Sequence, residues 1–258
     1  MKLKINLIEI IHTNNEYASN DMMGGYGLIT KIGTSFFSKG FTNLKKRWIN
    51  LPLFSFAYLS SILIGNNHEV SYNSNRFKDF DIIIIHINII SYSTAIDLLQ
   101  KIRRESKAII IAYGPFATFK SELFKEYANI VLRFEPENFF LNLKEIPGDK
   151  GILKVPLVSN LDSIPYPNWD ILPYKDYSLY PMIKERPILS ITTSRGCVFN
   201  CDYCAYRAYF GEVRKRNIYG VIDEIEYLKK KYQIKALLFR DQCLTDDNKR
   251  IIELCELM

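Results

Sequence analysis

Cysteine is absent from the first 196 of the 258 residues, and all five cysteines follow that point. The early part of the chain therefore has neither a disulfide nor a cysteine-bound metal. Long apolar runs are lacking too: no segment reaches the ~18 apolar residues needed to span a bilayer. The N-terminal stretch has no small-residue cleavage site of a signal peptide. These absences predict a cytoplasmic protein with reduced thiols that are available to a metal.

A strong charge of either sign is also missing, since the formal net charge is only +6. Basic residues occur in short runs, such as residues 45–47 and 214–216, which we interpret as solvated faces. No recognised nucleic-acid-binding motif accompanies them, so nucleic acid is not an expected partner. With 48% apolar and 24% charged residues, the composition is that of a globular protein.

The first part of the chain alternates apolar strand-like runs with helical patterns, which predicts an α/β domain. The run at residues 81–88 is apolar on both faces, as in a strand covered by helices on both sides. A glycine-containing loop at residues 24–27 follows the first strand. We predict a Rossmann-like parallel sheet domain over residues 1–145. Its expected strands are 5–11, 69–72, 81–88, 108–113 and 130–132, and its expected helices are 54–64, 95–104 and 121–127.

Proline marks the next segment, because seven of the ten prolines fall between residues 146 and 187. Proline disfavours helices and central strands, so this segment is predicted to be a linker, ordered around Trp169. Regular patterns return in residues 188–258 as a strand (189–193), a helix (219–232), a strand (236–239) and a helix (246–257). Thr245 is the expected N-cap of the last helix.

Three cysteines, Cys197, Cys201 and Cys204, have the spacing C-x-x-x-C-x-x-C. Three thiolates at this spacing can each take one iron of a cubane cluster. The fourth iron then stays open to a substrate or cofactor. A zinc site would need a fourth ligand, for which Cys243 and Cys255 are the candidates.

This loop resembles the cluster loop of the radical S-adenosylmethionine (SAM) superfamily, whose signature is C-x-x-x-C-x-aromatic-C. Tyr203 occupies the aromatic position. The resemblance implies a [4Fe-4S] cluster on the three cysteines, SAM on the open iron, and Tyr203 against the adenine. It also implies reductive cleavage of SAM to a 5′-deoxyadenosyl radical. An electron donor such as flavodoxin or ferredoxin would be a partner.

The later segments VIDEIEYL, LLFRDQCLTDD and RIIELCELM resemble the start of the radical SAM partial TIM barrel. The resemblance implies that Asp241 meets the SAM ammonium group, since barrel sites lie at the carboxyl ends of strands. Arg216, with Arg214, would help to hold a carboxylate of SAM. An ordinary solvated turn aspartate and surface arginines are the alternatives.

The segments IIIAYGPFAT, RFEPEN and NLDSIPYPNWDIL resemble the cobalamin-binding-like domain and linker that precede this barrel in one branch of the superfamily. The resemblance implies a cobalamin site lined by Gly114, Pro115 and Glu135. Tyr113 replaces one glycine of the family pattern, and the motif with a lower axial histidine is missing. The alternative is a degenerate domain that only supports the barrel.

The implied activity is cobalamin-dependent methyl transfer, or a radical cyclisation or rearrangement, on an unidentified small-molecule or peptide substrate. The alternative is an inactive, truncated remnant that binds a cluster without turnover. Only 54 residues follow Cys204, enough for roughly two strand–helix units, so a partner chain that completes the barrel is the other expectation. An RNA-modifying methylthiotransferase is nearly excluded. The first domain of that class carries three further cysteines, whereas the first 196 residues of this chain carry none.

Overall fold

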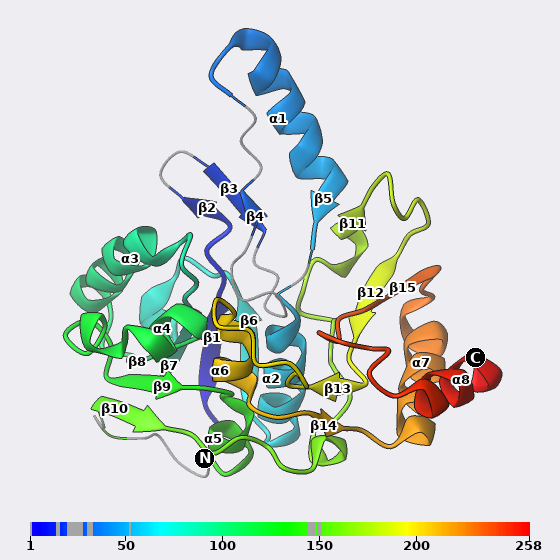
Figure 1. Cartoon of the computed structure of the whole chain (residues 1–258). Helices are drawn as coiled ribbons and strands as arrows, with labels where there is room; N and C mark the ends of the chain where they lie inside the picture. Colours follow the sequence, from blue (N-terminus) through cyan, green and yellow to red (C-terminus); the bar gives the residue numbers. More distant parts are fainter. Residues whose placement is uncertain are drawn as a thin grey trace.

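The computed structural model describes residues 2–13, 16–19, 28–29, 33–51, 53–143, 148 and 151–258. The predicted loop at residues 24–27 lies outside them. The main feature is a six-stranded sheet whose strand pairs are all parallel (Figure 1). The prediction of an α/β fold with a parallel sheet is therefore confirmed. In spatial order the strands are β10 (Gly151–Lys154), β9 (Ile130–Arg133), β8 (Ile109–Tyr113), β7 (Ile82–His86), β1 (Lys4–Ile8) and β6 (Glu69–Tyr72).

Both faces of the sheet are buried, as the strand β7 illustrates. Ile82 and Ile84 belong to the core on one face, beneath α2 (Phe54–Gly65). Ile83 and Ile85 belong to the core on the other face, with α3 (Tyr92–Glu105) and α4 (Pro115–Phe119). A strand covered on both sides needs apolar residues at every position, which explains the unbroken isoleucine run.

The strand order fixes where this sheet can bind a ligand. The chain passes from β1 outward to β6 and then returns to the other side of β1 as β7. Strand order therefore reverses between β1 and β7, and open parallel sheets bind ligands at the carboxyl ends around such a reversal.

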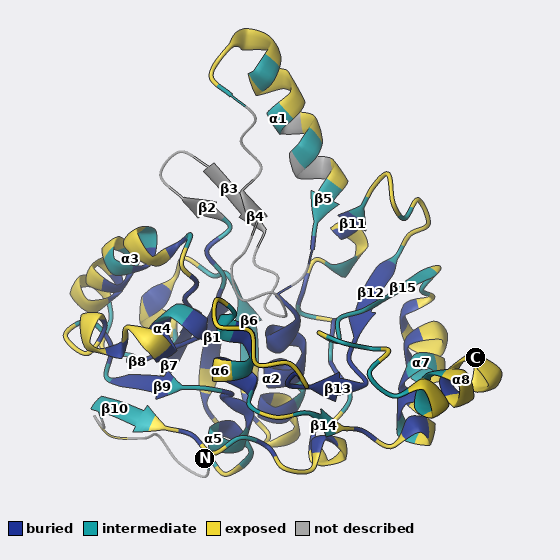
Figure 2. Ribbon diagram, in the orientation of Figure 1, coloured by how far each residue is buried: buried dark blue, intermediate teal, exposed yellow. Residues whose placement is uncertain are grey.

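Helix α1 (Phe36–Trp48) was not predicted, and it projects away from the rest of the molecule (Figure 1). Ser35 caps its N-terminus by accepting a hydrogen bond from the Ser38 amide. Phe36 and Phe37 are 86% and 79% exposed, and most of the helix that can be described is exposed (Figure 2). After α1, β5 (Ile49–Asn50) pairs antiparallel with β11 (Ser178–Leu179). A small sheet before α1 consists of β2 (His12–Thr13), β3 (Glu16–Ser19) and β4 (Leu28–Ile29).

Between the sheet and the last part of the chain, Trp169 is fully buried. Its amide donates to the hydroxyl of Tyr232 at 3.0 Å. The same apolar core contains residues of the sheet, of the proline-rich segment and of α6 (Ala205–Phe210). The short helices in these regions are α5 (Glu137–Leu141) and four 3-10 helices, η1 (Phe77–Asp79), η2 (Ser121–Leu123), η3 (Leu161–Ser163) and η4 (Tyr174–Asp176).

The last part of the chain forms a strand–helix–strand–helix unit. Strands β12 (Ile188–Ile191) and β15 (Ala236–Phe239) pair in parallel, connected through α7 (Ile218–Tyr232), and α8 (Asn248–Leu257) follows. The short strands β13 (Ser194–Arg195) and β14 (Arg214–Lys215) pair antiparallel. The predicted N-cap of α8 is wrong: Asp247, not Thr245, accepts the hydrogen bond from the Arg250 amide.

No helix among the described residues combines the length and the apolar character needed to cross a membrane.

Candidate functional site

The three cysteines of the motif lie on one loop that leads from β13 to α6. Cys197 is buried, Cys204 is partly buried and is the N-cap of α6, and Cys201 is exposed. The Cys204 amide donates to the Cys201 carbonyl at 3.0 Å, which closes a turn between the last two thiols. Among the described residues, no three His, Cys, Asp or Glu side chains lie close enough together to hold a metal ion. The loop thus carries the three thiols close together in sequence, with a backbone turn between the last two.

The donor chemistry and the backbone of this loop fit an iron–sulfur cluster. Three thiols within eight residues are soft ligands of the kind that clusters require. Gly196, just before Cys197, has φ +90°, and a Cβ there would overlap the carbonyl oxygen of Glu212. Only glycine can therefore make this entry into the loop. Arg207 donates to the carbonyls of Cys197 and Val198 at 3.2 and 3.0 Å, which leaves the thiols free of that guanidinium.

Asp241 anchors the chain immediately before the cysteine loop. It lies just beyond the carboxyl end of β15, and its carboxylate accepts hydrogen bonds from the Thr193 amide, the Thr193 hydroxyl and the Ser194 hydroxyl. These distances run from 2.6 to 3.0 Å. The structure therefore brings Asp241 to the base of the loop. Its predicted role at the SAM ammonium group stays a prediction.

Arg216 faces the interior of the strand–helix unit. Its guanidinium contacts the carboxylate of Glu224 at 2.7 Å and donates to the Thr192 carbonyl at 2.9 Å. Burial raises the pKa of Glu224, and the opposing charge of Arg216 lowers it in part. The interpretation of residues 214–216 as a solvated face is wrong for Arg214 and Arg216, whose side chains are 15% and 6% exposed. Lys215 between them points outward, because a short strand alternates its two faces.

Glu135 and Arg214 form an ion pair with two hydrogen bonds near the loop. The two nitrogens of Arg214 approach the two oxygens of Glu135 at 2.9 and 2.6 Å. Two residues that the sequence analysis missed complete the group: Arg195, two positions before Cys197, and Glu137. Arg195 lies 2.9 Å from Glu137 and 3.6 Å from Glu135. No local sequence signal marked Arg195 or Glu137 as buried.

Gly114 and Pro115 lie where predicted along the chain, at the carboxyl end of β8 and the start of α4. Gly114 has φ +122°, and a Cβ there would lie 2.9 Å from Cδ2 of His86. His86 is buried at the end of β7, and neither ring nitrogen has a hydrogen-bond partner among the described residues. Burial lowers its pKa to about 3, so this histidine is neutral.

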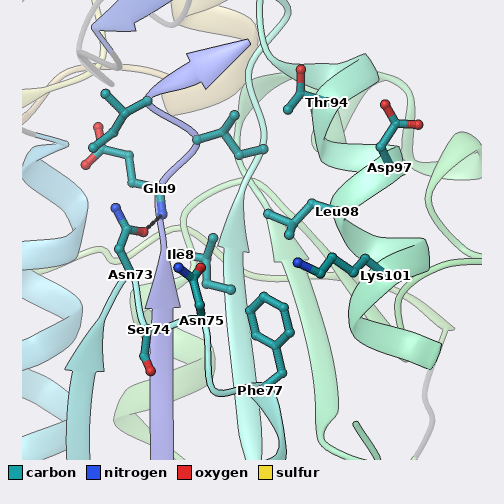
Figure 3. Close-up of a pocket in the computed structure, with 12 residues that line it drawn as sticks. Ile8, Glu9, Asn73, Ser74, Asn75, Phe77, Thr94, Asp97, Leu98 and Lys101 are labelled. Carbon is teal, nitrogen blue, oxygen red and sulfur yellow. Dashed lines mark hydrogen bonds between the residues drawn. The ribbon is translucent and has the colours of Figure 1, made fainter. Parts of the chain in front are cut away.

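A cavity of about 430 Å³ opens at the strand-order reversal (Figure 3). It lies at the carboxyl end of β1, between the segment after β6 and the helix α3. Ile8, Ile10 and Phe77 line its apolar part, while Asp97 and Lys101 of α3 contribute charge. Gly114, Pro115 and Glu135 are not among its lining residues. The structure thus separates this cavity from the three residues predicted to line a cobalamin site.

The remaining predicted site residue, Tyr203, lies on the loop between Cys201 and Cys204 and is 89% exposed. It contacts the solvent rather than Asp241 or Arg216, which face the base of the loop and Glu224. The structure therefore brings the cysteines and Asp241 to one region and leaves Tyr203 at its surface.

Comparison with known proteins gives both sequence relatives and structural neighbours. The chain is 32% identical over 167 residues to an uncharacterized methyltransferase of Pyrococcus horikoshii, which covers 56% of the chain and 36% of that protein. It is 29% identical over 138 residues to the anaerobic magnesium-protoporphyrin IX monomethyl ester cyclase of Cereibacter sphaeroides, which covers 50% of the chain and 22% of the cyclase. No family model matches the chain.

The fold matches a solved radical SAM methyltransferase, TsrM of Kitasatospora setae, determined with cobalamin and a [4Fe-4S] cluster bound. The TM-score is 0.58 at 14% identity, and the match covers all of this chain and 52% of TsrM. The chain thus spans about half the length of this neighbour. It spans a smaller share of the length of the two sequence relatives. These likenesses confirm the resemblance and the fold class predicted from the sequence.

Proposed function

We propose that the chain holds a [4Fe-4S] cluster for the reductive cleavage of SAM. Its sequence similarity to a methyltransferase and a cyclase and its fold similarity to a radical SAM methyltransferase support this proposal. Cys197, Cys201 and Cys204 are the proposed iron ligands. Methyl transfer, or a radical cyclisation or rearrangement, is the proposed outcome. The observation that carries the proposal is the cysteine loop itself: three thiols between β13 and α6, entered through a glycine that no other residue can replace.

When bound, the cluster would supply the electron that splits SAM into methionine and a 5′-deoxyadenosyl radical. The residues of this chain hold the site in place. Asp241 accepts hydrogen bonds from the Thr193 amide and the Ser194 hydroxyl, and Arg207 donates to the carbonyls of Cys197 and Val198 at the start of the loop. Tyr203, being exposed on the loop, is free to contact an adenine ring. A flavodoxin or ferredoxin is the partner class that we expect to deliver the electron.

The proposed division of the chain assigns cobalamin binding to residues 1–145 and the start of the barrel to residues 188–258, with a linker at 146–187. The carboxyl edge of the sheet, where Gly114 and Pro115 follow β8, is the proposed cobalamin side. Glu135 would contribute by fixing Arg214 rather than by facing the cofactor, because its carboxylate is fully buried.

The test is anaerobic reconstitution of the chain with iron and sulfide, followed by iron counting and electron paramagnetic resonance with and without SAM. We expect about four irons per chain and a spectrum that changes when SAM is added. Cys201→Ser should lose the cluster, whereas Cys255→Ser, an exposed thiol on α8, is the matched control and should keep it. Absence of iron, or a spectrum indifferent to SAM, would overturn the proposal.

A second candidate is a protein that binds the cluster but does not turn over SAM. The observation that favours it is the carboxylate of Asp241, which already accepts three kinds of donor from Thr193 and Ser194. A cluster whose spectrum responds to SAM, without release of 5′-deoxyadenosine under reducing conditions, would identify this function.

A further inference from the structure

Four charged side chains lie together where the N-terminal sheet meets the cysteine loop; three are buried and the fourth, Arg214, is 15% exposed. Glu135 and Glu137 follow β9, while Arg195 and Arg214 belong to the paired strands β13 and β14. The two carboxylates are 0% and 1% exposed, and Arg195 is 6% exposed. We call these four residues the buried ion cluster.

Within the buried ion cluster, the two carboxylates make different contacts. Glu135 holds Arg214 with both oxygens and also accepts the Val158 amide at 3.2 Å. Glu137 has no hydrogen bond from a described residue, and its one short charged contact is Arg195 at 2.9 Å. Glu137 therefore acts on Arg195 through charge.

The two carboxylates lie beside the charge of Arg195. The guanidinium is 2.9 Å from Glu137 and 3.6 Å from Glu135, and a guanidinium is not deprotonated in proteins. The guanidinium also lies over the ring of Tyr58 at 5.4 Å. Its charge is thus permanent and is balanced by the neighbouring carboxylates.

Arg195 connects the buried ion cluster to the cysteine loop. It lies two residues before Cys197, and both residues are buried. The charges that balance Arg195 therefore lie next to the first thiol of the loop. The two carboxylates and two guanidinium groups bring no net charge to this region, and that balance is exact only while all four are present.

We propose that Glu137, with Glu135, is a positioning residue that balances the charge of Arg195 and thereby sets the reduction potential of the cluster held by the cysteine loop. This inference rests on the proposed function. A reduced cluster carries one more negative charge than an oxidised one, and nearby charge shifts cluster potentials. An unbalanced Arg195 favours the reduced state, and unbalanced carboxylates disfavour it.

The test is a redox titration of the reconstituted chain, followed by electron paramagnetic resonance. Glu137→Gln keeps the shape and removes the charge, so the midpoint potential should shift to more positive values. Arg195→Gln should shift it to more negative values. The double variant should return close to the wild-type potential, because the charges are removed together. A merely structural role would weaken cluster binding in both single variants. It would not shift the midpoint potential in opposite directions in the two variants.

The matched control is Glu224→Gln, which also removes a fully buried carboxylate from an arginine, Arg216, but does so on α7. It should destabilise the chain and leave the potential near that of wild type. If Arg195→Gln does not fold, Arg195→Lys can replace it. This variant retains the charge and should have the midpoint potential of wild type, while the midpoint potential of Glu137→Gln should still shift to more positive values.

Shifts of the same sign in Glu137→Gln and Arg195→Gln, or an equal shift in Glu224→Gln, would overturn the inference. So would a potential that is unchanged in both single variants. These outcomes are distinct from failure of the proposed function, in which the wild-type chain itself binds no cluster or shows no response to SAM.

Discussion

His86 makes stability depend on pH in a way that can be calculated from its burial. The unfolded chain has a histidine pKa near 6.5, and burial lowers the folded value to about 3. Between these values the unfolded state binds a proton that the folded state does not, so the free energy of unfolding falls as the pH decreases. From pH 7 to pH 5 the loss amounts to about 2 kcal/mol from this residue alone.

The assay is urea unfolding of wild type and His86→Leu at pH 7, 6 and 5, followed by tryptophan fluorescence, to which the buried Trp169 and the partly exposed Trp48 contribute. His68, whose pKa is also lowered by burial, is present in both proteins, so the difference between them isolates His86. The variant should lose about 2 kcal/mol less than wild type over this range. Equal losses in both proteins would refute the reasoning.

Two further predictions concern backbone space and exposed surface. Gly196→Ala should lose most of the reconstituted iron, because its Cβ would overlap Glu212, whereas Gly40→Ala has open space and should keep the iron; equal iron contents would contradict this. Replacing Phe37 and Phe41 by serine should reduce self-association measured by sedimentation, since these rings are 79% and 58% exposed on α1. An unchanged sedimentation profile would show that this face does not drive association.

The spacing of apolar residues along the sequence was sufficient to predict most of the helices and strands. The strand β6 (Glu69–Tyr72) and the strand β15 (Ala236–Phe239) were predicted with the observed bounds, and the helix predicted over residues 54–64 is α2 (Phe54–Gly65), one residue longer. These elements carry apolar residues that pack against the core, so local pattern and tertiary environment agree. The short helix expected at residues 121–127 is only a 3-10 turn over Ser121–Leu123.

Helix α1 was missed because its sequence, with serine, glycine and threonine among its first residues, has weak intrinsic helix preference. Strand β10 was missed because it lies within the proline-rich segment. The N-cap of α8 was misplaced by two residues, since threonine and aspartate are both good caps and spacing alone does not choose between them.

The cysteine ligands could be proposed from spacing alone, but the residues that surround them could not. Arg214 and Glu135 are 79 residues apart, and Arg195 lies 60 residues from Glu135. Charged residues are usually exposed, so nothing local distinguishes an arginine destined for the interior from one on the surface. Only the fold brings these charges together.

The position of Arg195 also links the stability of two parts of the molecule. Burying a guanidinium without its carboxylates is costly, whereas burying it beside them is tolerated. The buried position of Arg195 is therefore tolerated only when Glu135 and Glu137, which follow β9, are also in place. The start of the cysteine loop thus depends for its stability on a corner of the N-terminal sheet.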